Sequence, residues 1–164
     1  MARVVLKLGD DVSTDAVYPG RFMATVLPSE TPKYAFADET AFNARLNKKE
    51  IPPGSVIVAG RNFGCGSSRE QAASCLKGHG LTVMARSFAR IFLQNSVNLG
   101  LKTVIVPELE ASPGDEIDYE GEKVVNRTTG KAYSITPLSD TQQGIINAGG
   151  LIPYARERLM KGRA

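Results

Sequence analysis

Short apolar runs alternate with helix-like segments over the first two thirds of the chain. Four runs of five mainly apolar residues occupy positions 4–8, 55–59, 81–85 and 102–106. Apolar runs of this length close to Gly or Pro predict buried strands. Helices are predicted at 69–77, where Ala72, Ala73 and Leu76 share one face, and after Ser87, the predicted cap of the second helix. This alternation with short links predicts a parallel βαβαβ segment in an α/β layer.

The rest of the chain follows a different pattern. Residues 33–47 have the spacing of short helical pieces, which Pro-Pro-Gly at 52–54 ends. After Pro107, three short strands separated by glycine-containing turns predict a small antiparallel β-meander at 115–119, 123–126 and 131–135. Two C-terminal helices, divided by two glycines, are predicted at 139–148 and 151–160. We expect all of these segments to form one domain over residues 1–164.

The composition is that of a soluble globular protein, with 42% hydrophobic and 23% charged residues. No apolar run reaches the roughly 18 residues that a membrane-spanning helix requires. The net charge of +3 comes from Lys and Arg spread along the chain, so no basic block predicts nucleic-acid binding. The first residues enter a predicted strand without the layout of a signal peptide. We therefore expect a cytoplasmic protein with no nucleic-acid or membrane partner.

Cysteine and histidine are scarce. Cys65, Cys75 and His79 are the only such residues in the sequence. They are too few for an all-cysteine iron–sulfur site or a zinc site, so any metal that the function needs is expected on another polypeptide. Cys65 is interpreted as a small packing residue because a lone thiol lacks the partners for a cluster, and its redox role stays open. His79 is interpreted as a polar loop residue.

Residues 64–70, Gly-Cys-Gly-Ser-Ser-Arg-Glu, combine a glycine-rich turn with the predicted start of a helix. The Lys-Ser/Thr pair of a Walker A motif does not follow the second glycine, and the third glycine of the dinucleotide fingerprint is missing. A nucleophile elbow requires glycines on both sides of its serine. Backbone N–H groups at the helix start, the helix dipole and Arg69 instead favour a carboxylate or an alkoxide.

Ser67 and Ser68 have two alternative roles in such a turn. Both hydroxyls can simply cap the following helix. Alternatively, one of them acts as a base, which requires that nearby N–H groups and a cation stabilise its alkoxide in a dry site. A catalytic role and a non-catalytic carboxylate- or anion-binding module therefore both remain open.

A wider set of residues resembles one known family. Residues 60–70, residues 87–92 and Asn95 are similar to the mobile swivel domain of the aconitase superfamily, and most closely to the free-standing small subunits of the 3-isopropylmalate dehydratase (isopropylmalate isomerase) and homoaconitase type. The resemblance implies an aconitase-type swivelling domain of β/β/α architecture. It implies a hydro-lyase subunit, in leucine biosynthesis for the dehydratase, that dehydrates or isomerises a 2-hydroxy dicarboxylic acid. It also implies a large partner subunit that carries a [4Fe-4S] cluster, with no cofactor bound by this chain.

The resemblance assigns roles to matching positions. Ser67 is the expected catalytic base that removes a proton beside a carboxylate, and Asp15 is expected to hydrogen-bond into the same catalytic network. The expected substrate-binding residues are Arg69, which holds a carboxylate, Arg21 as a second carboxylate ligand, and Ser68 and Gly66 in the same pocket.

The resemblance also points to the loop after the first strand as the reader of the substrate's variable group. Tyr18, Phe22 and Met23 are the candidates, and they favour an apolar group such as isopropyl or methyl. Gln71 stands where many family members have histidine, and its effect is open. Small subunits of homoaconitase or of a 2,3-dimethylmalate dehydratase are the alternatives within the family.

Overall fold

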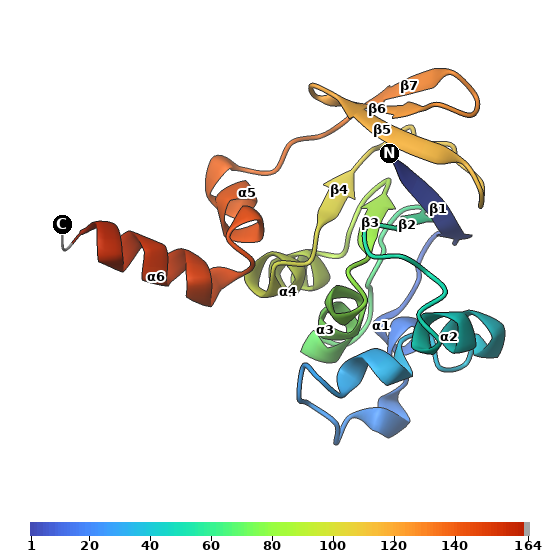
Figure 1. Cartoon of the computed structure of the whole chain (residues 1–164). Helices are drawn as coiled ribbons and strands as arrows, with labels where there is room; N and C mark the ends of the chain where they lie inside the picture. Colours follow the sequence, from blue (N-terminus) through green and yellow to red (C-terminus); the bar gives the residue numbers. More distant parts are fainter. Residues whose placement is uncertain (163–164) are drawn as a thin grey trace.

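A mixed sheet of seven strands forms the centre of residues 1–162, the part of the chain that the computed structural model describes (Figure 1). The strand order is β4-β3-β2-β1-β5-β6-β7. Strands β1 to β4 pair in parallel, and β5 to β7 continue the sheet in antiparallel pairing. The strands are β1 (Ala2–Lys7), β2 (Val56–Ala59), β3 (Thr82–Ala85), β4 (Thr103–Ile105), β5 (Glu116–Glu120), β6 (Lys123–Asn126) and β7 (Lys131–Ser134). The predicted α/β fold with an antiparallel meander is confirmed.

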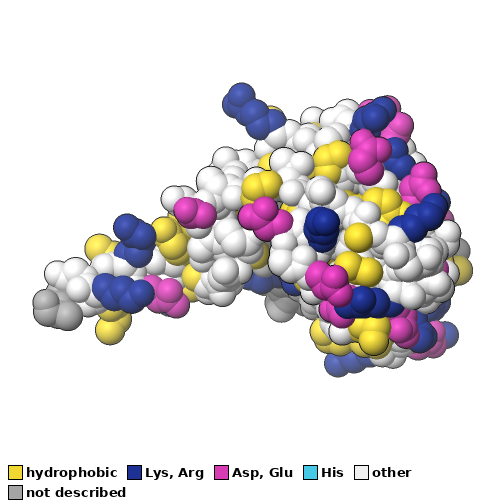
Figure 2. Space-filling model, turned by 90° about the horizontal axis from the view of Figure 1, so that it is seen from above, with side chains coloured by type: hydrophobic (Ala, Val, Ile, Leu, Met, Phe, Trp, Pro, Cys, Tyr) yellow, Lys and Arg dark blue, Asp and Glu magenta, His cyan; other side chains and the backbone are white. Residues whose placement is uncertain are grey.

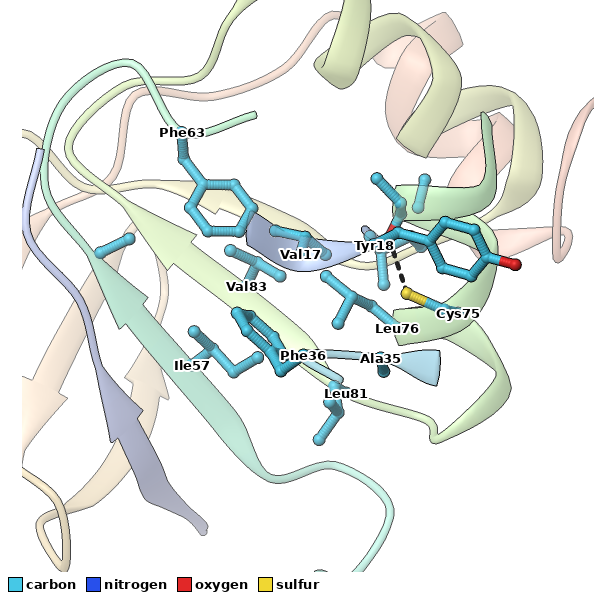
Figure 3. Close-up of a cluster of buried hydrophobic side chains, with 14 of the residues drawn as sticks. Val17, Tyr18, Ala35, Phe36, Ile57, Phe63, Cys75, Leu76, Leu81 and Val83 are labelled. Carbon is cyan, nitrogen blue, oxygen red and sulfur yellow. Dashed lines mark hydrogen bonds between the residues drawn. The ribbon is translucent and has the colours of Figure 1, made fainter. Parts of the chain in front are cut away.

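Two helices connect the parallel strands. Helix α3 (Glu70–Gly78) lies between β2 and β3, and α4 (Arg90–Leu99) lies between β3 and β4. Every residue of β2 and β3 is buried. Ile57 and Val83 pack in the cluster shared with the helices (Figure 3), whereas Val58 and Met84 pack on the opposite face with residues that follow β4. Burial on both faces explains why these strands are continuous apolar runs in the sequence.

The segment after β1 folds over helix α3. It contains α1 (Thr14–Val17), the 3-10 helices η1 (Gly20–Phe22) and η2 (Thr31–Tyr34), and α2 (Thr40–Asn47). His79, at the end of α3, contacts this segment through a 2.8 Å hydrogen bond between its Nε2 and the Pro32 carbonyl oxygen. The short helical pieces predicted within 33–47 are therefore confirmed.

Both helix starts predicted from hydroxyl residues differ in the structure. Helix α3 begins at Glu70, and its N-cap is Arg69, in extended conformation and without a side-chain cap hydrogen bond. Helix α4 begins at Arg90 with Ala89 as its N-cap, so the prediction that Ser87 caps it is wrong. The Ser87 hydroxyl accepts a 2.8 Å hydrogen bond from the Asn62 N–H instead. Tertiary packing supplies these hydroxyls with partners that local cap rules do not include.

The C-terminal helices match their predicted ranges. Helix α5 (Asp140–Asn147) begins with a capping box, in which Ser139 and Gln142 exchange side-chain and backbone hydrogen bonds. Helix α6 (Leu151–Lys161) follows two glycines and projects from the body of the protein as an arm (Figure 1). Among the helices of residues 1–162, none is long and apolar enough to cross a membrane.

Candidate active site

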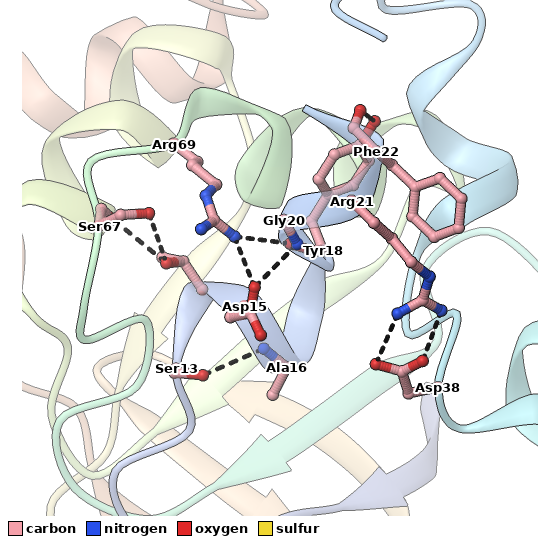
Figure 4. Close-up of polar contacts among 11 residues, drawn as sticks. Ser13, Asp15, Ala16, Tyr18, Gly20, Arg21, Phe22, Asp38, Ser67 and Arg69 are labelled. Atoms are coloured by element: carbon pink, nitrogen blue, oxygen red, sulfur yellow. Dashed lines mark hydrogen bonds and ion pairs between the residues drawn. The ribbon is translucent and has the colours of Figure 1, made fainter. Parts of the chain in front are cut away.

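The loops after β1 and β2 run side by side at the carboxyl edge of the parallel strands. The Gly64 N–H donates to the Val12 carbonyl at 2.7 Å, and the Thr14 N–H donates to the Cys65 carbonyl at 2.8 Å. Because β1 and β2 are parallel neighbours, their following loops leave the sheet at the same edge. This pairing brings residues 14–15 against residues 67–69, although more than 50 residues separate them in the sequence (Figure 4).

The shape of the second loop depends on its glycines. Gly64 has φ +85°, and a Cβ atom at this position would lie 2.2 Å from Cγ of Phe92. Gly66 has φ +99°, also in the region that side chains rarely adopt. Ser67 and Ser68 follow as exposed residues ahead of the helix N-cap. The alternative in which both serines merely cap α3 is therefore wrong.

The Ser67 hydroxyl lies against a buried hydroxyl from the other loop. Thr14 is 2% exposed, and its Oγ1 is 3.2 Å from Oγ of Ser67 and donates to the Ser67 carbonyl oxygen at 3.2 Å. Asn95 of α4 donates from Nδ2 to the Ser68 carbonyl at 3.2 Å. The backbone and hydroxyl of Ser67 are thus held by Thr14, which lies 53 residues away in the sequence.

Arg69 and Asp15 form an ion pair beside these serines. Nη1 of Arg69 donates to Oδ1 of Asp15 at 2.9 Å and to the Tyr18 carbonyl oxygen at 3.2 Å. The Arg69 side chain is only 17% exposed, and its Nε is buried without a hydrogen-bond partner. A buried N–H with no acceptor is unfavourable, and an anionic ligand would pair with it only after the side chains that cover it move.

Asp15 is held in its ionised form. Its carboxylate also accepts a 2.8 Å hydrogen bond from the Gly20 N–H. The hydrogen bond from Arg69, and then that from Gly20, lower the pKa of this carboxyl below its ordinary value. An exposed carboxylate with a lowered pKa is a poor proton donor at neutral pH, so its contribution here is to orient Arg69.

Arg21 is not brought to Ser67 and Arg69. Its guanidinium makes two bonds to the Asp38 carboxylate, at 2.5 and 3.3 Å, and lies over the Phe22 ring (Figure 4). Both side chains of the pair are more than half exposed. Binding of a second substrate carboxylate by Arg21 stays a prediction.

The three predicted specificity residues have different environments. Tyr18 is fully buried, and its hydroxyl donates to the carbonyls of Phe22 and Thr25, so the ring anchors the loop. Phe22 is half-buried and stacks on Tyr34 with 4.0 Å between ring centroids. Met23 is 49% exposed.

Met23 also borders the groove in front of the candidate site. This groove, of about 470 Å³, is lined by Met23, Val26, Pro28, Ser67, Ser68, Arg69, Glu70, Gln71, Ser74 and Leu99. Nε2 of Gln71 donates to the Met23 carbonyl oxygen at 3.2 Å. Gln71 therefore ties the loop to helix α3, and the groove joins an apolar wall to the serines and Arg69.

The cysteines are not placed to bind a metal. Cys75 is fully buried against the core, which raises the pKa of its thiol, and Cys65 is half-buried in the glycine loop. Across residues 1–162, no group of three or more His, Cys, Asp or Glu side chains is arranged to hold a metal ion.

Three residues of this region were not predicted. Thr14 precedes the predicted Asp15, so its position next to a candidate site residue could have indicated it. Asn95 belongs to the motif of the resemblance, which gave it no role. Asp38 lies 17 residues from Arg21, and no local pattern connects the two.

Comparisons with known proteins agree with this fold. The model of the aconitase C-terminal domain matches residues 12–109. The 3-isopropylmalate dehydratase small subunit of Thermodesulfovibrio yellowstonii is 42% identical over 161 residues, which cover 94% of this chain and 93% of that protein. The small subunit of Aquifex aeolicus is 44% identical over 160 residues, which cover 94% of each.

A solved structure extends the likeness to three dimensions. The crystal structure of 3-isopropylmalate dehydratase (leuD) from Methanocaldococcus jannaschii matches with a TM-score of 0.86 and 38% identity, covering 98% of this chain and 96% of that one. The resemblance seen in the sequence is confirmed. The chain belongs to the aconitase C-terminal domain family, and within it to the 3-isopropylmalate dehydratase small subunits.

Proposed function

We propose that this chain is the small subunit of a heteromeric 3-isopropylmalate dehydratase, which isomerises its substrate by dehydration and rehydration. The observation that carries the proposal is the pairing of an exposed Ser67 hydroxyl with a largely buried Arg69 whose Nε has no partner, at one groove. A substrate with a carboxylate beside its acidic C–H bond fits both groups. The names of the relatives support the same function.

Arg69 is proposed to bind the substrate carboxylate next to the carbon that loses its proton. Its Nη1 is occupied by Asp15 and Tyr18, which leaves Nε and Nη2 as one edge of the guanidinium. That edge can make two parallel hydrogen bonds to a carboxylate. The bound carboxylate then stabilises the carbanion that forms beside it.

Ser67 is proposed as the base, with Thr14 as its supporting residue. In the neutral state Thr14 donates to the Ser67 carbonyl and can accept from the Ser67 hydroxyl. When Ser67 is an alkoxide, the Thr14 hydroxyl can rotate and donate its hydrogen to Oγ of Ser67, which lies 3.2 Å from Oγ1 of Thr14. Free N–H groups at the start of α3 and the cation of Arg69 add further stabilisation of negative charge.

The iron–sulfur cluster is proposed to reside on the large subunit. The two cysteines of this chain lie in different environments, and its described residues offer no ligand set for a metal. When bound there, the cluster supplies a Lewis acid that assists the loss of hydroxide. This chain's part is to bind a carboxylate, move the proton at Oγ of Ser67 and cover the reacting groups.

The apolar wall of the groove supports a branched alkyl side group on the substrate. Met23 and Val26 are 49% and 63% exposed beside the serines and Arg69. A homoaconitase substrate carries an additional carboxylate, with which Met23 and Val26 cannot pair and which would share the groove with the acidic Glu70. Isopropyl therefore fits better than a carboxylate, and 2,3-dimethylmalate is the alternative with a smaller apolar group.

The test is reconstitution with a cluster-bearing large subunit. The chain alone, the large subunit alone and the mixture are assayed with 3-isopropylmalate, 2,3-dimethylmalate and the homoaconitase substrate, and products are identified by NMR. We expect that only the mixture acts on 3-isopropylmalate and that neither subunit does so by itself. If the mixture is inactive on all three, while calorimetry detects tight binding of small anions to the isolated chain, the non-catalytic binding module replaces this proposal.

A further inference from the structure

Helix α6 leaves the body of the protein with its apolar side chains uncovered. None of its residues is buried. Leu151, Ile152, Leu159 and Met160 are 44%, 68%, 64% and 73% exposed. The arm that it forms is visible in Figure 1, and Figure 2 shows hydrophobic and basic side chains along it. Contiguous exposed apolar patches are rare on soluble proteins, and the larger ones mark sites where a partner binds.

Three of the four exposed apolar residues lie on one face of the helix, and Met160 lies outside this face. At about 100° per residue, Leu151, Ala155, Leu159 and Ile152 fall within an arc of roughly 100°. Polar residues flank this face, and Nη1 of Arg158 donates to the Tyr154 hydroxyl within the helix at 2.9 Å. Tyr154 packs against the small hydrophobic cluster formed by α4 and α5. The helix thus contacts the domain through Tyr154, whereas Leu151, Ile152 and Leu159 stay exposed.

The base of the arm adjoins the candidate active site. Nζ of Lys77 donates to the carbonyls of Leu99 and Gly149, and so joins the ends of α3 and α4 to the residues that precede α6. Leu99 also lines the groove that contains Ser67 and Arg69. A partner that covers this groove therefore reaches the start of α6 along a continuous surface.

We infer that α6 is a docking arm for the large subunit, which receives it in an apolar groove bordered by acidic side chains. This inference rests on the proposed function, because it takes the large subunit as the partner. The helix carries Arg156, Arg158 and Lys161 against a single Glu157, a net charge of 3 − 1 = +2. Acidic groups at the groove edges complement this charge, and apolar residues at i, i+3 and i+7 (Ile152, Ala155 and Leu159) suit helix-in-groove binding.

A second copy of the chain is a poorer occupant. Pairing two such helices would bring their positive charges together. An 11-residue helix is also only about 16 Å long. Four partly exposed side chains on each copy fall short of the roughly 1,200 Å² that stable interfaces bury.

Helix α6 lies beyond residues 12–109 that match the aconitase C-terminal domain, yet the solved relative aligns over 98% of this chain. At least part of the arm therefore belongs to the fold of a free-standing small subunit, which needs a contact to hold its partner.

The experiment compares two variants that introduce the same residue on opposite faces of α6. Ile152→Gln/Leu159→Gln removes the apolar face, whereas Glu157→Gln changes the polar face and serves as the matched control. Gln keeps a helix propensity close to that of Leu and Glu. Because α6 buries none of its residues, thermal unfolding of the isolated full-length chain should be unchanged in both. The Kd for the large subunit, measured by sedimentation, should rise at least about tenfold for the double variant and should not rise for the control, which removes the one negative charge of the helix.

The outcomes separate this inference from the proposed function. If the wild-type chain neither binds nor activates any large subunit, the proposed function fails and the docking arm with it. If wild type and double variant assemble equally well into active enzyme, the proposed function stands and the docking arm is refuted. If the isolated chain is a dimer that the double variant dissociates, while the large subunit still binds, the occupant is a second copy and the inference is overturned.

Discussion

Replacing Arg69 by Lys tests the proposed carboxylate site most directly. The Arg69 side chain is 17% exposed, its Nη1 is occupied by Asp15 and Tyr18, and its Nε is buried without a partner. The free edge is expected to make two parallel hydrogen bonds to a substrate carboxylate. Lys keeps the positive charge but offers a point charge in place of this planar fork. The variant therefore removes geometry and one hydrogen bond while preserving the charge.

The size of the effect follows from the lost bond. A hydrogen bond to a charged group contributes about 1.5–3 kcal/mol. Because 1.36 kcal/mol corresponds to a tenfold change, kcat/KM should fall roughly 10- to 150-fold. The carboxylate is present in the bound substrate as well as in the transition state, so most of the loss should appear as a higher KM.

Steady-state kinetics of the reconstituted enzyme provide the assay. Arg127→Lys is the matched control, because Arg127 pairs with Asp118 and Glu120 on the antiparallel strands, away from the groove. Its kinetics should equal those of wild type. Wild-type kcat and KM for Arg69→Lys would refute the role of Arg69 as a carboxylate ligand, provided that the variant assembles normally.

Three further predictions concern the same site. Ser67→Ala should lower kcat about 10²- to 10⁴-fold, the usual contribution of a general base, without weakening assembly; unchanged turnover would remove Ser67 from this role. Thr14→Val, which keeps the shape of the buried side chain but not its hydroxyl, should lower kcat more than it raises KM, and an effect on KM alone would contradict support of the base. The lowered pKa of Asp15 means that its ionised form stabilises the fold above the ordinary carboxyl pKa near 4 and loses this effect as the pH falls. Urea unfolding should therefore show a larger loss of stability for Asp15→Asn at pH 7 than at pH 3, and equal losses would argue against the ion pair with Arg69.

Several features could be predicted because they depend on neighbours in the sequence. Strands β2 and β3 are buried on both faces, and this appears as uninterrupted apolar runs. Ser139 starts a helix through a capping box that spans three residues. The glycine turn could be recognised because Gly64 and Gly66 adopt positive φ, which few other residues tolerate.

Other predictions failed or stayed incomplete because residues distant in the sequence determine the contacts of the side chain concerned. Ser87 has the residue type of a cap, but its hydroxyl is taken by the Asn62 N–H. The sequence favoured Tyr18 as a residue that meets the substrate, yet the ring is buried and its hydroxyl holds the loop. Arg21 is engaged by Asp38, 17 residues away. In each case the competing partner comes from packing that a local pattern does not contain.

The sequence by itself therefore determined the order of strands and helices, the glycine turn and, through the resemblance, the family and the expected roles of Ser67 and Arg69. Only the tertiary structure decided which groups meet them. Parallel pairing of β1 and β2 places Thr14 and Asp15 beside residues more than 50 positions away. The same fold buries Nε of Arg69 without a partner, and the packing of α6 on α4 and α5 leaves an apolar face of α6 exposed. Local patterns set backbone conformation, whereas the contacts of a site depend on which edges and faces the fold brings together.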